Sequence, residues 1–167
     1  YITRINEVPL LDGDTWNLTI SGIGDEDIIL SLPELQALPS FEYPLTIQCV
    51  GNNPADTLIS TANWRGFRIY DLLRDLGMSE FVGGVRYNAA DGYYASHTVD
   101  ELRENNVMGA LMMNDVELPP VQGFPLRMIN PGLHGVKQPA WITEIEVLSM
   151  GEMEAEYQDF WAPFGYD

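Results

Sequence analysis

Cys49 is the single cysteine of this sequence, and it lies near the end of the apolar segment 45–50. Strand alternation predicts that Leu45, Ile47 and Cys49 share one face, with the thiol as the last residue on an otherwise apolar side. A single cysteine cannot form an internal disulfide, so it acts as core filler, as a reactive thiol or as a metal ligand. The residue types alone leave all three roles open.

Several other side chains can bind a ligand, and each also has an ordinary structural role. Arg127 follows a Gly-Phe-Pro-Leu turn, and its guanidinium suits either bidentate capture of phosphate or carbonyl groups or a salt bridge in an acidic chain. Lys137 is the only lysine. Tyr93 and Tyr94 follow an Asp-Gly turn, where a phenol can donate a hydrogen bond or simply lie at a sheet edge. Asn52 is also typical of a plain turn.

Short strands and short helices must position these side chains. The helix expected at 31–38 has Ser31 as its N-cap, Pro33 in its first turn and Glu34 in the place of a capping box. Many Pro and Gly turns separate the segments, so we expect an α+β fold that is mainly β. We expect one domain over residues 1–150, with an acidic tail, 151–167, packed on it. The expected strands are 16–22, 45–50, 85–89, 109–114, 126–130 and 141–148, and two further helices are expected at 69–76 and 99–105.

The charge balance restricts the partners of the protein. The chain has 25 acidic and 8 basic residues, for a net charge of −17. Such a surface repels nucleic acid and anionic membranes, because binding phosphates requires basic residues. The balance fits either adaptation to high salt or an acidic exported protein, and we expect an extracytoplasmic location, in the periplasm or at the cell surface.

Several classes of protein are disfavoured by motifs that the sequence lacks. No run of about eighteen apolar residues occurs, so we expect no membrane span. The chain opens at Tyr1 rather than Met and shows no secretory leader, which indicates a processed or excised segment. It has no Cys-x-x-Cys-His haem motif, no Gly-x-Ser-x-Gly nucleophile motif and no zinc-ligand spacing.

Five segments, in order, resemble the molybdopterin-binding domain of the sulfite oxidase and bacterial sulfoxide reductase family. They cover nearly the whole chain at spacing similar to that of the family. The resemblance implies the sulfite-oxidase-type fold of mixed sheets with short helices, and a molybdenum–molybdopterin cofactor. The segments are 16–22 with the helix after it, Thr-Ile-Gln-Cys-Val-Gly-Asn (46–52), Ile-Ser-Thr-Ala-Asn-Trp-Arg-Gly (59–66) through 72–73, Ala-Ala-Asp-Gly-Tyr (89–93), and Gly-Phe-Pro-Leu-Arg (123–127) followed by Pro-Gly (131–132), His-Gly (134–135) and Trp-Ile (141–142).

The resemblance also implies roles for individual residues. Cys49 matches the cysteine that binds molybdenum, where a soft thiolate adds a third sulfur to the two of the pterin dithiolene. Metal coordination deprotonates such a thiol without a neighbouring base. Tyr93 and Tyr94 lie where sulfite oxidases carry an active-site phenol, so they join Cys49 as candidate catalytic residues. The candidate cofactor-binding residues are Asn52, Gln122, Arg127, His134, Lys137 and Gln138.

The chain departs from the family at positions that are usually basic. Asn53 and Pro54 replace arginines after the Cys-x-Gly-Asn turn, and Ala140 replaces the basic residue before the tryptophan. Gln122 stands in place of histidine or asparagine, and the arginine of the lead-in has a match only in Arg4, where the alignment is poor. Each lost cation removes a contact worth about 1.5–3 kcal/mol. We therefore expect a neutral substrate of the S- or N-oxide type rather than sulfite.

Two functions follow from these observations. One is an oxidoreductase that transfers an oxygen atom to or from a small-molecule substrate and exchanges electrons with a separate partner, for which a cytochrome is the natural candidate. The other is an extracytoplasmic binding or interaction module that keeps the fold without the cofactor. The missing basic residues favour the second function, and the presence of Cys49 favours the first.

Overall fold

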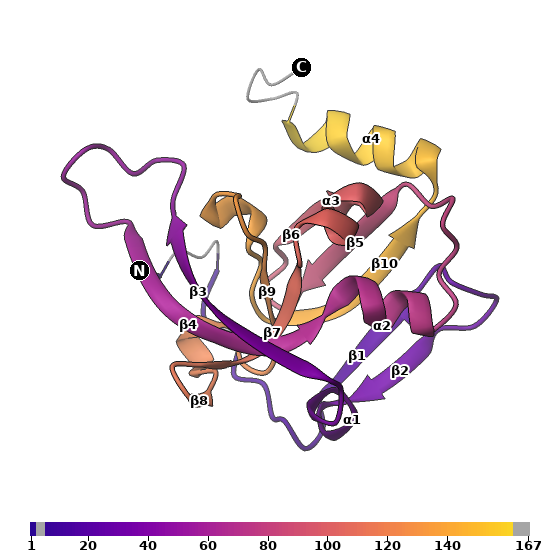
Figure 1. Cartoon of the computed structure of the whole chain (residues 1–167), viewed down its shortest axis with the longest axis horizontal. Coiled ribbons are helices and arrows are strands. Elements are labelled where there is room, and N and C mark those ends of the chain that lie inside the picture. The colour runs from indigo at the N-terminus through magenta and orange to yellow at the C-terminus, as the bar shows by residue number, and fades with distance from the viewer. Residues whose placement is uncertain (3–5, 162–167) are drawn as a thin grey trace.

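The computed structural model describes residues 1–2 and 6–161, with side chains up to Glu156. Ten strands form two five-stranded sheets, and short helices cover them (Figure 1). The expected α+β class, mainly β, is confirmed. Within this part of the chain, no helix is both long and apolar enough to cross a bilayer.

The first sheet is mixed. Strands β1 and β10 run parallel, and the other neighbours in this sheet are antiparallel. Its order is β2-β1-β10-β5-β6. The bounds are β1 Asn17–Ser21, β2 Ile28–Ser31, β5 Gly84–Ala89, β6 Tyr94–Thr98 and β10 Ile142–Leu148.

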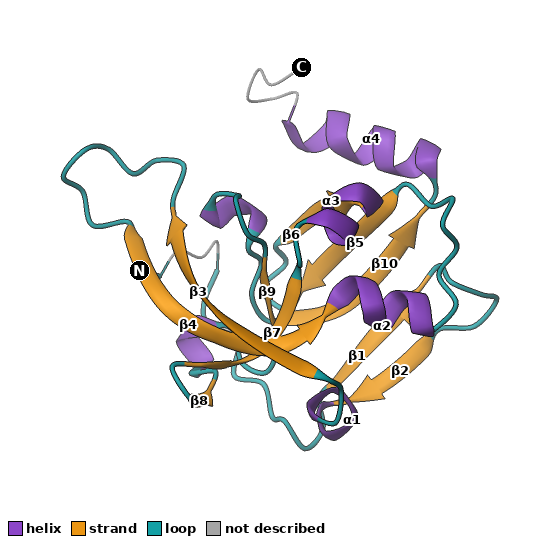
Figure 2. Cartoon of the chain, in the orientation of Figure 1, coloured by secondary structure: helices purple, strands orange, loops and turns teal. Residues whose placement is uncertain are grey.

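The second sheet is antiparallel, in the order β3-β4-β7-β8, with β9 paired to β7. Strands β3 and β4 form a long ribbon whose connecting loop extends beyond the body of the molecule (Figure 2). The bounds are β3 Ser40–Gln48, β4 Ile59–Arg68, β7 Met108–Met113, β8 Val116–Glu117 and β9 Arg127–Ile129.

The helices are short, and local sequence explains where they begin. The capping box expected at Ser31 and Glu34 is present, and Thr98 and Glu101 form a second one. The helices are α1 Leu32–Gln36, α2 Ile69–Asp75, α3 Val99–Glu104 and α4 Met150–Trp161, with 3-10 turns η1 Pro120–Gln122 and η2 Gly135–Lys137.

Helix α4 contains most of the tail that was expected at 151–167. Met153 is buried, and Glu156 accepts hydrogen bonds from Arg86 Nη1 at 3.2 Å and Ser96 Oγ at 2.8 Å. The helix contacts β5, β6 and β10. The aromatic side chains of the tail, Tyr157, Phe160 and Trp161, lie outside the described residues, and the division at residue 150 stays a prediction.

Two hydrophobic cores stabilise these layers. The larger one joins the first sheet to α2 and α3 through residues such as Leu18, Tyr87 and Leu102. The smaller one lies along the second sheet, around Ile47 and Trp64. Close packing of β4 on β7 depends on a residue without a side chain, because a Cβ at Gly66 would collide with the carbonyl oxygen of Gly109.

We predict that Gly66→Ala lowers the free energy of unfolding by about 1–3 kcal/mol, because the new methyl group meets backbone that cannot move aside. Urea denaturation measures the effect. Gly24→Ala is the matched control, since no atom lies within 4 Å of a Cβ built there. Equal midpoints for the two variants would contradict the packing described for β4 and β7.

Candidate functional site

A pocket of about 160 Å³ opens where loops from both sheets meet. Four of the residues expected from the sequence line it: Cys49 after β3, Tyr93 before β6, Arg127 at the start of β9, and Gln138 after η2. Each stands at or next to an end of its strand or turn. The wall of the pocket also contains Tyr1, Ile2, Asp91, Val121, Gly135, Val136, Pro139, Ala140 and Trp141.

Hydrogen bonds within its own loop hold Cys49 in place. The Cys49 amide donates to the Leu58 carbonyl at 2.9 Å, and the Cys49 carbonyl accepts from the Asn52 amide at 3.1 Å. The Asn52 side chain accepts from the Leu58 amide at 2.8 Å. Asn52 therefore closes the loop behind the thiol and does not line the pocket. The half-buried Cys49 does line it.

Arg127 is a half-buried cation that forms no ion pair with an acidic side chain among the described residues. Its Nη1 donates to the Gln122 carbonyl at 3.0 Å and to Gln122 Oε1 at 3.2 Å, and its guanidinium lies 5.4 Å from the centre of the Trp64 ring. Its Nε is buried without a hydrogen-bond partner. Among the described residues, no ion pair includes Arg127.

The surroundings of Arg127 determine the charge of its guanidinium. Burial lowers the pKa of the guanidinium to about 10. The group therefore stays charged at neutral pH, and no acidic side chain among the described residues forms an ion pair with it. Because a buried charge without compensation is strongly unfavourable, this arrangement suits a pocket whose ligand brings oxygen atoms or negative charge. Gln122 does not line the pocket but fixes the guanidinium within it.

The loop from residue 134 to residue 140 forms one wall. Gln138 Nε2 donates to the Leu133 carbonyl at 3.0 Å and to the Asn130 carbonyl at 2.5 Å, and Gln138 Oε1 accepts from the Asn130 amide. The Tyr93 hydroxyl donates to the Val136 carbonyl at 2.7 Å. Burial raises the pKa of Tyr93 to about 12, so this proton stays in place. Tyr93 thus braces the loop, and its catalytic role stays a prediction.

Lys137 points away from the pocket, although it belongs to the same loop. Its ammonium donates to the Ser96 carbonyl at 2.6 Å. Burial lowers the pKa of Lys137, while the charges of Glu101 and Glu156 act to raise it. The side chain therefore ties the loop to β6 and lies near α3 and α4, and its role in binding the cofactor stays a prediction.

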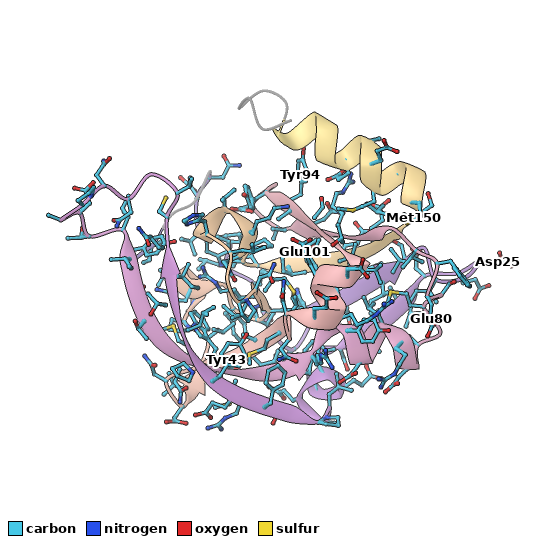
Figure 3. The ribbon with its side chains drawn as sticks, turned by 45° about the horizontal axis from the view of Figure 1, so that its top comes forward. Asp25, Tyr43, Glu80, Tyr94, Glu101 and Met150 are labelled. Carbon is cyan, nitrogen blue, oxygen red and sulfur yellow. The ribbon has the colours of Figure 1, made fainter. Side chains whose placement is uncertain are left out.

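Two further candidates lie outside the pocket wall. The Tyr94 ring lies 5.5 Å from the Arg86 guanidinium, and Tyr94 is next to α4 (Figure 3). His134 is exposed and precedes η2 without capping it by its side chain. The roles predicted for both, as for Asn52, Gln122 and Lys137, receive no support from the shape of the pocket.

The positions at which the family carries basic residues fall in two places. Asn53 is in the exposed tip of the β3–β4 loop, where its amide and side chain donate to Asp56 at 3.2 and 3.1 Å, and Pro54 is beside it. Ala140 lines the pocket itself. Arg4 lies outside the described residues. The pocket wall therefore has an apolar methyl group at the position where the family resemblance predicted a basic side chain.

Sequence reasoning missed Tyr1, Asp91 and Trp141 as parts of the pocket. The Tyr1 hydroxyl is buried without a partner, and burial raises the pKa of this phenol, with the charge of Cys49 as a second cause. The Asp91 carboxylate accepts from the Tyr93 amide at 3.0 Å. A Trp-Ile motif pointed to Trp141, but no pattern in the lead-in segment pointed to Tyr1.

Comparison with known proteins identifies the kind of domain. The sequence profile of the oxidoreductase molybdopterin binding domain family matches residues 5–157. The chain belongs to this family. It is therefore a molybdopterin-binding domain, and the resemblance noted in the sequence is confirmed. Because the matched range includes β1 through most of α4, the family assignment covers both sheets.

Three relatives contain a segment that is similar to this chain. Human mitochondrial sulfite oxidase is 32% identical over 165 residues, which cover 84% of this chain and 30% of that protein. A Volvox carteri NADH nitrate reductase is 31% identical over 96% of this chain and 21% of its own length. The uncharacterized oxidoreductase YuiH of Bacillus subtilis is 28% identical over 99% of this chain and 79% of its own. The chain thus spans about 30% of the length of the sulfite oxidase that it matches.

A solved structure confirms the fold. The sulfane dehydrogenase SoxCD from Paracoccus pantotrophus superposes with a TM-score of 0.79 at 18% identity, over 84% of this chain and 40% of that one. At this identity the likeness concerns the arrangement of the two sheets and their helices. It confirms the sulfite-oxidase-type fold expected from the sequence.

The residues of the pocket fit a molybdenum–molybdopterin cofactor. The thiol of Cys49 is a soft donor of the kind such a metal takes, and Arg127 has an unpaired Nε for an oxygen-rich group. The buried hydroxyl of Tyr1 is a second polar atom that lacks a partner. Trp141 and Val121 supply apolar walls. Soft ligand, cation and apolar wall thus meet in one pocket.

We predict that Arg127→Met separates cofactor binding from folding. In the cofactor-free chain, the free energy of unfolding stays the same or rises by roughly 1–2 kcal/mol, because the cost of burying a charge is removed. Retention of molybdenum falls about tenfold or more, because a charge-assisted contact is lost. Thermal unfolding and metal analysis after dialysis measure the two effects.

Arg65→Met is the control for this change. Arg65 pairs with Glu42 at 2.7 Å and with Asp115 at 2.6 Å on the surface of the second sheet. Its loss should cost at most about 1 kcal/mol of stability and leave molybdenum retention unchanged. An Arg127→Met chain that retains the metal as wild type does would contradict the role given to the guanidinium.

His97 makes the stability of the folded chain dependent on pH. The ring is fully buried beside Tyr87, with centroids 5.4 Å apart, and neither ring nitrogen has a partner among the described residues. Burial first, and the charge of Lys137 second, lower the pKa of His97 to about 3. Below the ordinary pKa of about 6.5, the unfolded chain therefore binds a proton that the folded chain does not, and stability falls as pH drops.

We predict that His97→Met removes this dependence. At pH 7 the variant should lie within about 1 kcal/mol of wild type, because the ring has no hydrogen bond to lose. At pH 4.5 it should be the more stable chain by roughly 2–3 kcal/mol. Urea denaturation at both pH values measures the difference, and a constant difference across pH would show that His97 is not held neutral.

Proposed function

We propose that this chain is a molybdenum-cofactor-dependent oxidoreductase that transfers an oxygen atom to or from a small, neutral substrate of the S- or N-oxide type. The observation that carries the proposal is that Cys49 and the unpaired Arg127 line one pocket. The relatives named as sulfite oxidase and nitrate reductase support oxidoreductase chemistry in this family.

Each pocket residue has a definite task in this proposal. The cofactor, when bound, supplies the change of oxidation state and the site of oxygen transfer. Cys49 provides the soft protein ligand, and binding to a metal keeps its sulfur deprotonated. Arg127, held by Gln122 and Trp64, binds oxygen atoms of the pterin or its phosphate. The braced loop from 134 to 140, with Trp141 beside it, excludes water from the site.

The electrostatics of the pocket favour a neutral substrate. Arg127 is the one basic side chain in the wall of this pocket as described, and Asp91 adds a carboxylate to it. Ala140 contributes a methyl group at the position where the family resemblance predicts a basic residue. The chain as a whole has a net charge of −17, which slows the approach of a dianion such as sulfite.

The partner and location are proposals of the same kind. Electrons would pass to or from a separate redox protein, for which a cytochrome is the natural candidate. The acidic surface suits a partner with a basic face, because complementary charge accelerates encounter. The same acidic composition suits an extracytoplasmic protein, in the periplasm or at the cell surface.

We predict that the chain contains stoichiometric molybdenum when it is made in a host that synthesises the cofactor, and that Cys49→Ser loses activity. Elemental analysis and turnover of a neutral sulfoxide, compared with sulfite, measure this. Wild-type protein without molybdenum would instead fit the binding module that lacks a cofactor. Normal turnover by Cys49→Ser would show that the thiol is not the ligand, and faster turnover of sulfite would overturn the choice of a neutral substrate.

A further inference from the structure

Three tyrosines lie in or near the pocket loops, and they differ in what their hydroxyl groups do. The Tyr93 hydroxyl donates to the Val136 carbonyl at 2.7 Å, so its proton is already in use. The Tyr94 ring lies against Arg86 and next to α4. The Tyr1 hydroxyl is buried, and it has no hydrogen-bond partner within the described part of the chain.

The position of Tyr1 is built by separate parts of the fold. Its backbone nitrogen donates to Ser60 Oγ on β4 at 2.9 Å, which places the residue beside the ribbon of the second sheet. Its ring packs on the smaller hydrophobic core. Its hydroxyl oxygen lies against Gly135, where an added Cβ would collide with it. The phenol thus occupies space that exists because residue 135 is glycine.

The surroundings of the hydroxyl are those of the proposed site. The same pocket is lined by Tyr1, Cys49 and Arg127. The charges of Cys49 and Arg127 both influence the pKa of the Tyr1 phenol. A buried hydroxyl without an acceptor is unfavourable, and it becomes favourable once a ligand presents an oxygen atom. The Tyr1 hydroxyl can donate its proton to such a ligand, whereas the Tyr93 hydroxyl already donates to the Val136 carbonyl.

We propose that the Tyr1 hydroxyl donates a hydrogen bond to an oxygen atom of the ligand that binds between Cys49 and Arg127, and that Gly135 makes room for it. The inference rests on the proposed function, because it takes the ligand to be the molybdenum cofactor or a substrate beside it. In this proposal Tyr1 supplies the active-site phenol that the family resemblance assigned to Tyr93 and Tyr94.

The test is Tyr1→Phe in the full chain, with Tyr43→Phe as the matched control, since the Tyr43 hydroxyl is also buried without a partner but does not line the pocket. Molybdenum retained after dialysis, the melting temperature of the cofactor-free chain, and kcat and KM for a neutral sulfoxide are measured. If the cofactor presents the oxygen atom, Tyr1→Phe lowers molybdenum retention about tenfold. If the substrate presents it, molybdenum content is unchanged, and kcat or KM worsens about tenfold.

In either case the cofactor-free Tyr1→Phe chain melts at or above the wild-type temperature, because the hydroxyl has no partner to lose. Gly135→Ala should reproduce the loss, and the double variant should be no worse than the single ones, because both act on one contact.

Two results would overturn the inference. One is Tyr1→Phe protein that equals wild type in molybdenum retention, kcat and KM. The other is a Tyr1→Phe chain whose cofactor-free form is destabilised, with unchanged molybdenum retention and kinetics, which would show a packing role. A wild-type chain that binds no molybdenum would sink the proposed function together with this inference, whereas a loaded wild type with an indifferent Tyr1→Phe variant would sink the inference alone.

Discussion

Arg127 keeps a positive charge inside the protein without a carboxylate to balance it, and the rest of the site depends on that constraint. Gln122 fixes its Nη1 and Trp64 covers its face, but neither neutralises it. Holding a half-buried charge without an ion-pair partner is unfavourable, and a ligand that brings oxygen atoms or negative charge would offset that cost. Cys49, in the same pocket, supplies a donor that suits a soft metal. A metal carried by an oxygen-rich organic ligand satisfies both groups together.

The architecture meets this constraint by bringing strand ends together rather than by building the site on one element. Cys49 follows β3, Arg127 opens β9, and Tyr93 precedes β6. Hydrogen bonds between separate elements then fix the geometry. The Tyr93 hydroxyl donates to the Val136 carbonyl in the loop from 134 to 140, and the Lys137 ammonium donates to the Ser96 carbonyl on β6. Residues that contact no ligand therefore help to stabilise the pocket.

Local sequence predicted the elements that carry strong start and stop signals, and missed those formed by distant pairing. The capping box of α1 and the alternation of β10 were both readable from the chain. Strand β4 was not, because residues 59–63 lack alternation and the strand is fixed by its pairing with β3 and, over residues 64–68, with β7. The motifs predicted Cys49 and Arg127 as site residues, and both line the pocket. The position of the Lys137 side chain could not be predicted, because its ammonium donates to the Ser96 carbonyl on β6, far away in the sequence. Tyr1 had no sequence signal, since its place depends on Ser60 and Gly135, far along the chain.

The most direct test of the central claim is an anomalous difference map, recorded at the molybdenum absorption edge from crystals of the metal-loaded protein. The account predicts a single strong peak beside the Cys49 sulfur, inside the pocket that Arg127 lines. A peak at another place in the molecule, or a Cys49 sulfur sealed from the metal in loaded protein, would contradict it.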